Sequence, residues 1–408
     1  MLLSVLVALT VIMVTARLVG AVFKRLGQPA VIGEVVGGIL LGPSLLGRFS
    51  PDGAATLLPS DSAPFLGLIA QLGVILYMFL VGLELDLGVL RSRVATTFAI
   101  AIASIVLPFA MGGALAWALY DGLAPAGVGF TPFALFMGVS MSITAFPVLA
   151  RILSDRGLQR TPMGVVALTC AAINDAIAWC LLAFVVGVTQ STTSAAAQTV
   201  ILTAIYIALM LSVGRRVMVM VIERFDTSPN VGERSLAVVL VAVLLSAVAT
   251  EFIGIHAIFG AFLLGAIIPH ESVIARHATE RLQDIVRVMF LPAFFAFTGL
   301  RTEIGLVESG QDWLICGVIV AVAVAGKFGG TVIASRVMGI DWRDSAALGI
   351  LMNTRGLVEL IVLNIGLDLG VISPRLFTML VIMALVTTMM TAPILSRLLR
   401  ARPWVAET

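Results

Sequence analysis

The ionisable residues inside long apolar stretches carry the most distinctive chemistry in this sequence. Asp175 lies about fourteen residues into the apolar stretch 161–188, or about 21 Å along a helix. A carboxylate near the centre of a bilayer costs roughly 2.5–3.5 kcal/mol, and binding of a proton or a cation stabilises it. One carboxylate cannot hold both at once, so Asp175 is the candidate shared site for a proton and a metal ion such as Na⁺ or K⁺. The alternative role for Asp175 is a structural hydrogen bond.

Three further charged residues lie in the apolar stretches 311–336 and 344–368. Lys327, one of only two lysines in the chain, lies far from both ends of its stretch. It needs a carboxylate, a carbonyl or a helix C-terminus as its partner, and the alternative is a lysine that reaches the membrane surface. Arg355 and Glu359 are four residues apart, so on a helix they share a face. We interpret them as an ion pair that compensates charge rather than as proton carriers.

Helix-breaking residues interrupt two of these stretches. Pro147 lies within the stretch 130–152, where proline removes a backbone donor and displaces the carbonyl four residues earlier. Asn353, Thr354, Arg355 and Gly356 interrupt the stretch 344–368. Irregular backbone at this depth is tolerated only beside a cavity or inside the protein, so we expect two broken helices that meet at a binding site. A simple kink at Pro147 is the alternative.

Two other polar side chains are expected near such a site. Asn174 precedes Asp175 and points about 100° away from it on a helix, so it is expected to shape the site rather than to bind a cation beside Asp175. Glu34 lies in the apolar stretch 29–47 and either lines a funnel through which ions enter or sits at the membrane interface.

The composition is that of an all-α integral membrane protein. The chain has 408 residues, of which 60% are hydrophobic and 12% charged, whereas soluble domains carry about 25% charged residues. The net charge of +2 gives no indication of nucleic-acid binding, and the three cysteines form neither a disulfide framework nor a zinc motif. No metalloprotease HExxH motif is present. We therefore expect no enzyme activity and no cofactor.

Thirteen membrane spans are predicted from the apolar windows. When the span ends that border each loop are counted with it, 19 of the 25 basic residues fall in the odd-numbered loops and the C-terminal segment, which the positive-inside rule places in the cytoplasm. The N-terminus is then outside and the C-terminus is cytoplasmic. The spans are expected at 1–22, 29–47, 64–85, 94–119, 130–152, 161–188, 196–222, 234–252, 255–270, 283–300, 311–336, 344–368 and 375–398.

A weak internal repeat relates spans that are seven apart. The motif G-L-x-x-[D/E]-[L/I]-G begins at Gly82 and again at Gly299. The pair Gly33 and Gly38 has the same spacing as the pair 260 and 265, and coincidence among glycine-rich helices is the alternative. An odd offset inverts the second copy across the membrane, a feature of secondary transporters. We predict one transmembrane domain over 1–408, with six-helix repeats at about 1–188 and 234–400, a linker helix at about 196–222 and no soluble regulatory domain.

Together these motifs resemble the monovalent cation:proton antiporter superfamily, in the branch with bacterial Na⁺/H⁺ and K⁺/H⁺ antiporters and plant cation/H⁺ exchangers. The resemblance covers about residues 5–400. The stretches that carry it are Gly33–Ser44, Phe79–Asp86, Ile143–Arg151, Asn174-Asp175, Gly254–Gly260, Lys327-Phe-Gly-Gly and Asn353–Glu359.

The resemblance implies crossed discontinuous helices 5 and 12, with Thr144 at the crossing and Asn174 and Asp175 as the cation and proton site. It also implies a homodimer and a core that moves across the membrane in the manner of an elevator. Electrogenic relatives carry two adjacent aspartates where this chain has Asn174 and Asp175. One titrating carboxylate indicates electroneutral 1:1 exchange, unless Lys327 also releases a proton.

The expected function is therefore exchange of Na⁺ or K⁺ for H⁺ by alternating access, in a bacterial-type plasma membrane. A sodium-coupled symporter of an organic anion on a related fold is the alternative. Such a symporter requires a roomier cavity, whereas Asp175 with Lys327 fits a small ion.

Overall fold

The protein is entirely helical over the residues that the computed structural model describes, which are 2–84, 94–158, 161–190, 193–226, 233–269 and 272–400. Ten helices within these ranges are long and apolar enough to span a membrane. They cover Leu2–Arg25, Ala30–Phe49, Ala63–Leu83, Thr96–Leu123, Pro162–Thr189, Ile201–Arg224, Arg234–Ile253, Val273–Leu306, Gly310–Val337 and Pro374–Leu398. Each overlaps one predicted span, so the prediction of an all-α membrane protein is confirmed.

The remaining three predicted spans correspond to shorter helices. The stretch 130–152 contains α7 (Phe130–Ser142) and α8 (Phe146–Asp155), and the stretch 344–368 contains α17 (Trp342–Met352) and α18 (Leu357–Asp368). The stretch 255–270 contains α13 (Ala257–Ile267). The predicted interruptions are confirmed, because a non-helical segment separates the two half-helices of each broken pair.

The chain forms two compact units. The first consists of Met1–Met13, Leu58–Val89 and Ala183–Phe297, and the second of Val14–Leu57, Leu90–Leu182 and Thr298–Thr408. The helices α1 (Leu2–Arg25), α9 (Pro162–Gln190) and α15 (Leu291–Leu300) each run from one unit into the other along the chain. The units do not coincide with the predicted repeats, since each takes segments from both.

The first unit is built around α5, which packs on α13, and α13 in turn packs on α12. Gly82 on α5 and Gly265 on α13 meet so closely that a Cβ on either would lie 2.9 Å from the Cα of the other. Tyr206 on α10 bonds Ser246 on α12 (2.5 Å), which donates to the Gly260 carbonyl (2.7 Å). The helices are α5 (Ala63–Glu84), α10 (Thr193–Leu209), α11 (Arg215–Asp226), α12 (Glu233–Ile253), α13 and α14 (Val273–Ile285), with π-helical turns at Met210–Gly214 and Val286–Phe290.

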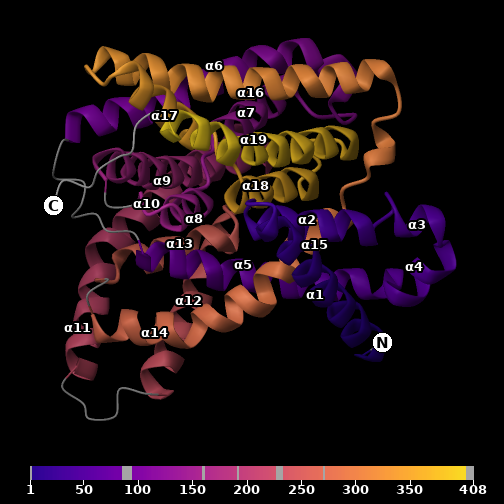
Figure 1. Cartoon of the computed structure of the whole chain (residues 1–408). Coiled ribbons are helices and arrows are strands. Elements are labelled where there is room, and N and C mark those ends of the chain that lie inside the picture. The colour runs from indigo at the N-terminus through magenta and orange to yellow at the C-terminus, as the bar shows by residue number, and fades with distance from the viewer. Residues whose placement is uncertain are drawn as a thin grey trace. The chain divides into compact units, whose positions relative to one another are not determined.

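The second unit contains both broken helices. Within it α6 lies along α16, and α7 and α17 pack against these two long helices (Figure 1). Gly38 on α2 and Gly299 on α15 make another close approach, because a Cβ at Gly299 would lie 2.7 Å from the Gly38 Cα. Its other elements are α2 (Ala30–Leu41), α3 (Leu46–Phe49), α4 (Pro51–Leu57), α6 (Val94–Leu123), α16 (Gly310–Val337) and α19 (Pro374–Arg400).

The position of Pro147 explains the form of the first break. Proline is the second residue of α8, where the missing N–H removes no helical hydrogen bond. The residues 143–145 before it are extended rather than helical. The proline therefore lies at the start of a new half-helix. The alternative, a simple kink in a continuous helix, is wrong.

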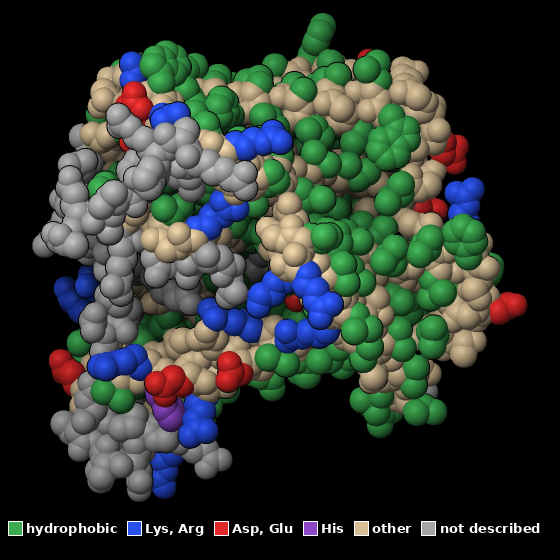
Figure 2. Space-filling model, in the orientation of Figure 1, with side chains coloured by type: hydrophobic (Ala, Val, Ile, Leu, Met, Phe, Trp, Pro, Cys, Tyr) green, Lys and Arg blue, Asp and Glu red, His purple; other side chains and the backbone are tan. Residues whose placement is uncertain are grey.

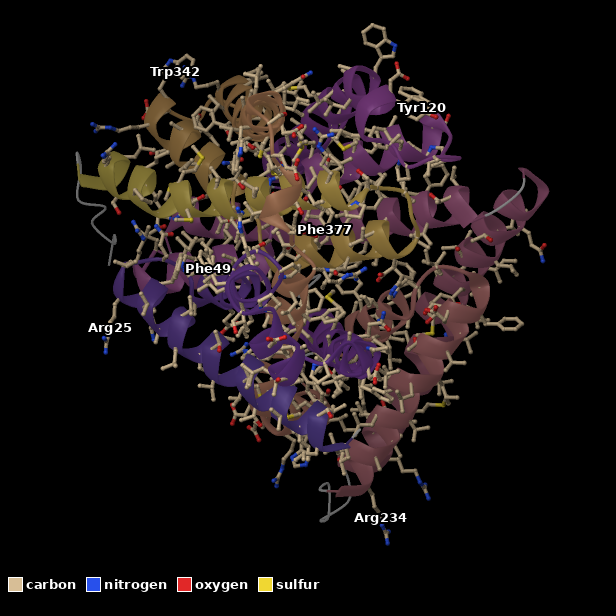
Figure 3. All side chains as sticks on the ribbon, turned by 90° about the vertical axis from the view of Figure 1, so that its right-hand side faces the viewer. Arg25, Phe49, Tyr120, Arg234, Trp342 and Phe377 are labelled. Carbon is tan, nitrogen blue, oxygen red and sulfur yellow. The ribbon has the colours of Figure 1, made fainter. Side chains whose placement is uncertain are left out.

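The surface is apolar, as a helix bundle in lipid requires. Hydrophobic side chains cover much of the face in Figure 2, and large apolar residues such as Leu3, Trp117 and Phe252 are more than 70% exposed. Figure 3 places Trp342, at the start of α17, on the periphery, whereas Phe377 on α19 lies in the packed interior with no exposed surface.

Candidate functional site

The two broken helices are joined at their interruptions by hydrogen bonds. The backbone N–H of Ala145 donates to the carbonyl of Thr354 at 3.0 Å. The hydroxyl of Thr144 donates to the carbonyl of Met352, the last residue of α17, at 2.9 Å. Unwound backbone needs such partners because it has lost its helical hydrogen bonds. The interruptions of α7–α8 and α17–α18 thus meet in the core of the second unit, and Thr144 lies where they meet.

Asn174 is bonded into the same crossing. Its amide nitrogen donates to the hydroxyl of Thr144 at 3.3 Å and to the hydroxyl of Ser104 on α6 at 2.9 Å. The Ser104 hydroxyl in turn donates to the carbonyl of Ala101 at 2.8 Å. These bonds hold α9 against α6 and the first break.

Asp175 differs from its neighbour because its carboxylate has no such partners. Its side chain is 2% exposed, and no hydrogen bond of good geometry reaches either oxygen from the described residues. The backbone amide of Phe146, the first residue of α8, lies close enough to interact with it, and so does the charge of Lys327. Asp175 therefore faces the N-terminal end of α8, where the helix dipole favours negative charge. The choice between an ion site and a structural hydrogen bond for Asp175 stays a prediction.

Lys327 lies at the carbonyl end of α7. Its side chain is fully buried on α16, and its ammonium donates to the carbonyl of Ser142 at 2.5 Å and to that of Ser104 at 2.9 Å. The expectation of a carbonyl or helix C-terminus as its partner is confirmed. The alternative of a lysine that reaches the membrane surface is wrong, because the carbonyls hold the ammonium inside the unit.

Arg355 completes the same end of α7. Its guanidinium donates to the carbonyl of Ser140 at 2.5 Å and to that of Met141 at 2.7 Å. It also forms the predicted ion pair with Glu359 at 2.9 Å, in which both side chains are fully buried. Glu359 lies in the first turn of α18, where the helix dipole favours negative charge. Two cationic side chains thus satisfy the last three carbonyls of α7.

The C-terminal helix α19 supports the second break from the other side. The hydroxyl of Thr388 accepts from the backbone N–H of Arg355 at 3.0 Å and donates to its carbonyl at 2.6 Å. Thr391 contacts the hydroxyl of Thr354 at 3.4 Å. Gly356 packs against α8, since a Cβ there would lie 2.6 Å from Cγ2 of Val148. The threonines and the glycine together fix the backbone between α17 and α18.

Glu34 lies in the second unit on α2, where its side chain is buried against α1. The residue is 9% exposed, and a Cβ at Gly20 on α1 would lie 3.4 Å from its Cγ. The charge of Arg17 on α1 acts on it. None of the hydrogen bonds described above links Glu34 to the crossing, so its role as part of a funnel stays a prediction.

Several residues of the site were not identified from the sequence. Ser104, Ser142, Thr388 and Thr391 are hydroxyl residues in apolar helices, a common type that satisfies itself by bonding the preceding turn. Ser142 does bond the preceding turn, through Gly138 at 2.7 Å. Their position in an apolar stretch is the only signal in the sequence, and it does not separate them from other such hydroxyls.

The chain is similar over nearly its whole length to known transporters. The family model "Sodium/hydrogen exchanger, transmembrane" matches residues 11–401. The Na(+)/H(+) antiporter NhaS4 of Synechocystis sp. is 44% identical over 399 residues, which are 97% of this chain and 97% of that protein. The Cation/H(+) antiporter 17 of Arabidopsis thaliana is 41% identical over 94% of this chain, and the K(+)/H(+) antiporter 1 of Saccharomyces cerevisiae is 34% identical over 94% of it.

The chain spans about half the length of these plant and yeast relatives, 47% and 45% respectively. Among solved structures, the sodium proton antiporter MjNhaP1 from Methanocaldococcus jannaschii matches with a TM-score of 0.73. The match covers 98% of this chain and 97% of that one, at 14% sequence identity. This likeness concerns the fold.

Proposed function

The chain belongs to the sodium/hydrogen exchanger family, and on this premise we propose that it exchanges Na⁺ or K⁺ for H⁺ by alternating access, with Asp175 as the carboxylate that both ions share. The observation that carries the proposal is that the carboxylate of Asp175 is buried and accepts no hydrogen bond from any side chain of the described residues. An ionised carboxylate in such a place needs a proton or a cation. We therefore assign Asp175 as the residue that binds whichever of the two ions is carried.

Counting the buried charges supports electroneutral exchange. Asp175 and Glu359 are acidic, and Lys327 and Arg355 are basic, so the empty site with all four groups ionised is neutral. Either one proton or one monovalent cation at Asp175 brings the net charge to +1. Lys327 lies against the carbonyls of Ser104 and Ser142, whose negative dipole ends favour its charged form whichever ion is bound. We infer that Lys327 keeps its proton through the cycle and that the stoichiometry is 1:1.

The glycine contacts support an inverted repeat in a fold of thirteen spans. Gly82 in span 3 meets Gly265 in span 9, and Gly299 in span 10 meets Gly38 in span 2. An offset of seven spans converts the first contact into the second, because span 3 corresponds to span 10 and span 2 to span 9. Residues 85–88 of the first G-L-x-x-[D/E]-[L/I]-G motif lie outside the described residues.

We further propose the arrangement of the transporter in the cell. All of the site residues belong to the second unit, as an elevator movement of one body requires. The chain would work as a homodimer in the plasma membrane, with its N-terminus outside and its C-terminus in the cytoplasm. The uneven distribution of the basic residues among the loops supports this orientation.

The test is cation-driven proton movement in proteoliposomes, followed with a pH-sensitive dye. Na⁺, K⁺ and Li⁺ are titrated with the wild type, with Asp175→Asn, and with Asp368→Asn as the matched control. Asp368, the last residue of α18, pairs with Arg301, and the Asp368 side chain is 45% exposed, so its loss leaves Asp175 intact. We expect Asp175→Asn to abolish exchange and Asp368→Asn to retain it. Equal activity of the wild type and Asp175→Asn would contradict the role of Asp175.

A second measurement tests the stoichiometry. Electroneutral exchange has the same rate at zero and at an imposed membrane potential, whereas movement of an extra proton makes the rate depend on the potential. A wild type that is folded but shows no cation-driven proton movement over a wide pH range would favour the sodium-coupled symporter of an organic anion. Sodium-dependent uptake of a labelled anion would detect that activity.

A further inference from the structure

Three of the four half-helix ends at the crossing face a side chain of complementary charge. The carbonyl end of α7 faces Lys327 and Arg355. The amide end of α8 lies near the Asp175 carboxylate, and the amide end of α18 carries Glu359 in its first turn. Each of these charges has the sign that the helix dipole favours at that end.

The fourth end, the carbonyl end of α17, receives only neutral donors from the described residues. The carbonyl of Met352 accepts from the hydroxyl of Thr144, and that of Ile350 accepts from the hydroxyl of Thr391 at 3.4 Å. The carbonyls of Gly349 and Leu351 accept from backbone N–H groups in the break. A helix C-terminus favours a positive charge, and this is the end at which none is supplied.

Asn353 lies at this end and its side chain is unsatisfied. It is the residue that follows α17, it has no exposed surface, and neither its amide nitrogen nor its amide oxygen has a hydrogen-bond partner among the described residues. The polar side chains on its C-terminal side, Thr354 and Arg355, are both bonded. Burying an amide without a hydrogen-bond partner costs free energy, so a ligand that binds this amide recovers part of that cost.

The chain connections place Asn353 and Asp175 beside the same short segment of the first interruption. The residues on either side of Asn353 are bonded to Thr144 and Ala145, through the carbonyls of Met352 and Thr354. The next residue after Ala145 is Phe146, whose amide lies near Asp175. Two buried side chains, whose oxygens accept no hydrogen bond from any side chain of the described residues, thus lie next to the same three-residue segment.

We propose that the transported alkali cation binds at the carbonyl end of α17, with the amide oxygen of Asn353 and the carboxylate of Asp175 as ligands. This inference rests on the proposed exchange function and names a second ligand for its cargo. Carboxylate and amide oxygens are suitable ligands for hard cations, and a cation there supplies the missing charge at the fourth half-helix end. Because Asn353 is neutral, it leaves the net charge of the occupied site at +1.

Asn353 also distinguishes the two cargoes. A proton needs only one oxygen of Asp175, whereas a dehydrated alkali cation needs several oxygens. Loss of the amide oxygen therefore weakens binding of the cation and leaves binding of the proton unchanged. A residue that only supported the fold would not separate the two.

The test compares Asn353→Ser with Asn353→Ala, which differ by one hydroxyl oxygen. In proteoliposomes we expect Asn353→Ala to raise the apparent KM for Na⁺ or K⁺ at least tenfold, with the proton dependence of exchange unchanged. Asn353→Ser should raise the KM less than threefold, because it keeps an oxygen. In detergent without alkali cations, both variants should unfold at or above the wild-type temperature, since no bond to Asn353 is lost.

Cation-induced thermal stabilisation gives a readout that does not depend on transport. We expect Na⁺ or K⁺ to stabilise the wild type and Asn353→Ser, and to stabilise Asn353→Ala much less. The proposal would be overturned if Asn353→Ala had the same KM and the same cation-induced stabilisation as the wild type. It would also be overturned if both variants lost the same amount of stability without cations. A wild type that shows this Asn353-dependent stabilisation but no exchange would leave the cation site standing and refute the exchange function. A wild type with neither response would refute both.

Discussion

Replacement of Gly356 by alanine tests how the interruption between α17 and α18 is held. A side chain added at Gly356 meets a steric obstacle on α8. Its Cβ would lie 2.6 Å from Cγ2 of Val148 and 3.4 Å from Cβ of Ala145. Carbon atoms pack at about 3.5–4.0 Å, so the Val148 methyl group would have to move by about 1 Å. A β-branched side chain on a helix has one strongly preferred rotamer, which prevents it from turning away.

The magnitude follows from the size of this overlap. Overpacking of a dense core costs about 1–3 kcal/mol, and we expect Gly356→Ala to lower the free energy of unfolding by this amount. Val148→Ala alone removes two methyl groups and leaves a cavity, at a cost of about 1.5–3 kcal/mol. In the double variant the clash is gone and the new methyl group fills part of the cavity. The double variant should therefore be about as stable as Val148→Ala.

The assay is a double-mutant cycle on the purified protein in detergent, with cation-driven exchange measured on the same four proteins. We expect a favourable coupling of about 1–3 kcal/mol between the two positions, and recovery of exchange in the double variant relative to Gly356→Ala. Additive losses of stability would refute the reasoning, because they would mean that Val148 does not limit the space at Gly356.

Three further predictions concern the charges and the hydroxyl at the crossing. Arg355→Gln should lower the free energy of unfolding by about 3–5 kcal/mol, because it leaves Glu359 buried without its cation. Glu359→Gln should lower it by only about 1–2 kcal/mol, because a glutamine oxygen still accepts from Arg355. Equal losses in the two variants would contradict this assignment, and thermal unfolding measures both. Thr144→Val should cost about 1–3 kcal/mol, since it leaves the carbonyl of Met352 without its donor, while Thr144→Ser should retain most of the stability. Finally, one shared carboxylate at Asp175 requires the apparent KM for the cation to rise about tenfold for each unit by which the pH falls, once the protonated form dominates, by mass action. A KM that does not change with pH in initial-rate measurements would exclude competition at one site.

Much of the architecture follows from local properties of the sequence. The long helices appear as apolar stretches because each must satisfy its backbone within itself in lipid. The two interruptions appear as Pro147 and as the polar run that ends at Gly356, since both oppose a continuous helix. The pair formed by Arg355 and Glu359 follows from four-residue spacing alone.

The partners of the other buried groups do not follow from the sequence, because they come from distant parts of the chain. Lys327 bonds backbone carbonyls at Ser104 and Ser142, and backbone carbonyls carry no mark in an amino-acid sequence. The threonines of α19 reach the second interruption only because that helix packs there. Such contacts depend on which helix faces meet.

The sequence by itself determined that this chain lies in a membrane, where its helices break and which buried charges require compensation, because these properties depend on hydropathy, spacing and the chemistry of single residues. The tertiary structure decided how the compensation is distributed. Among the described residues, it gave the carbonyl end of α7 two basic side chains and the carbonyl end of α17 only neutral donors, and it left the side-chain amide of Asn353 without a hydrogen bond. That distribution depends on distances between segments that only the folded chain brings together.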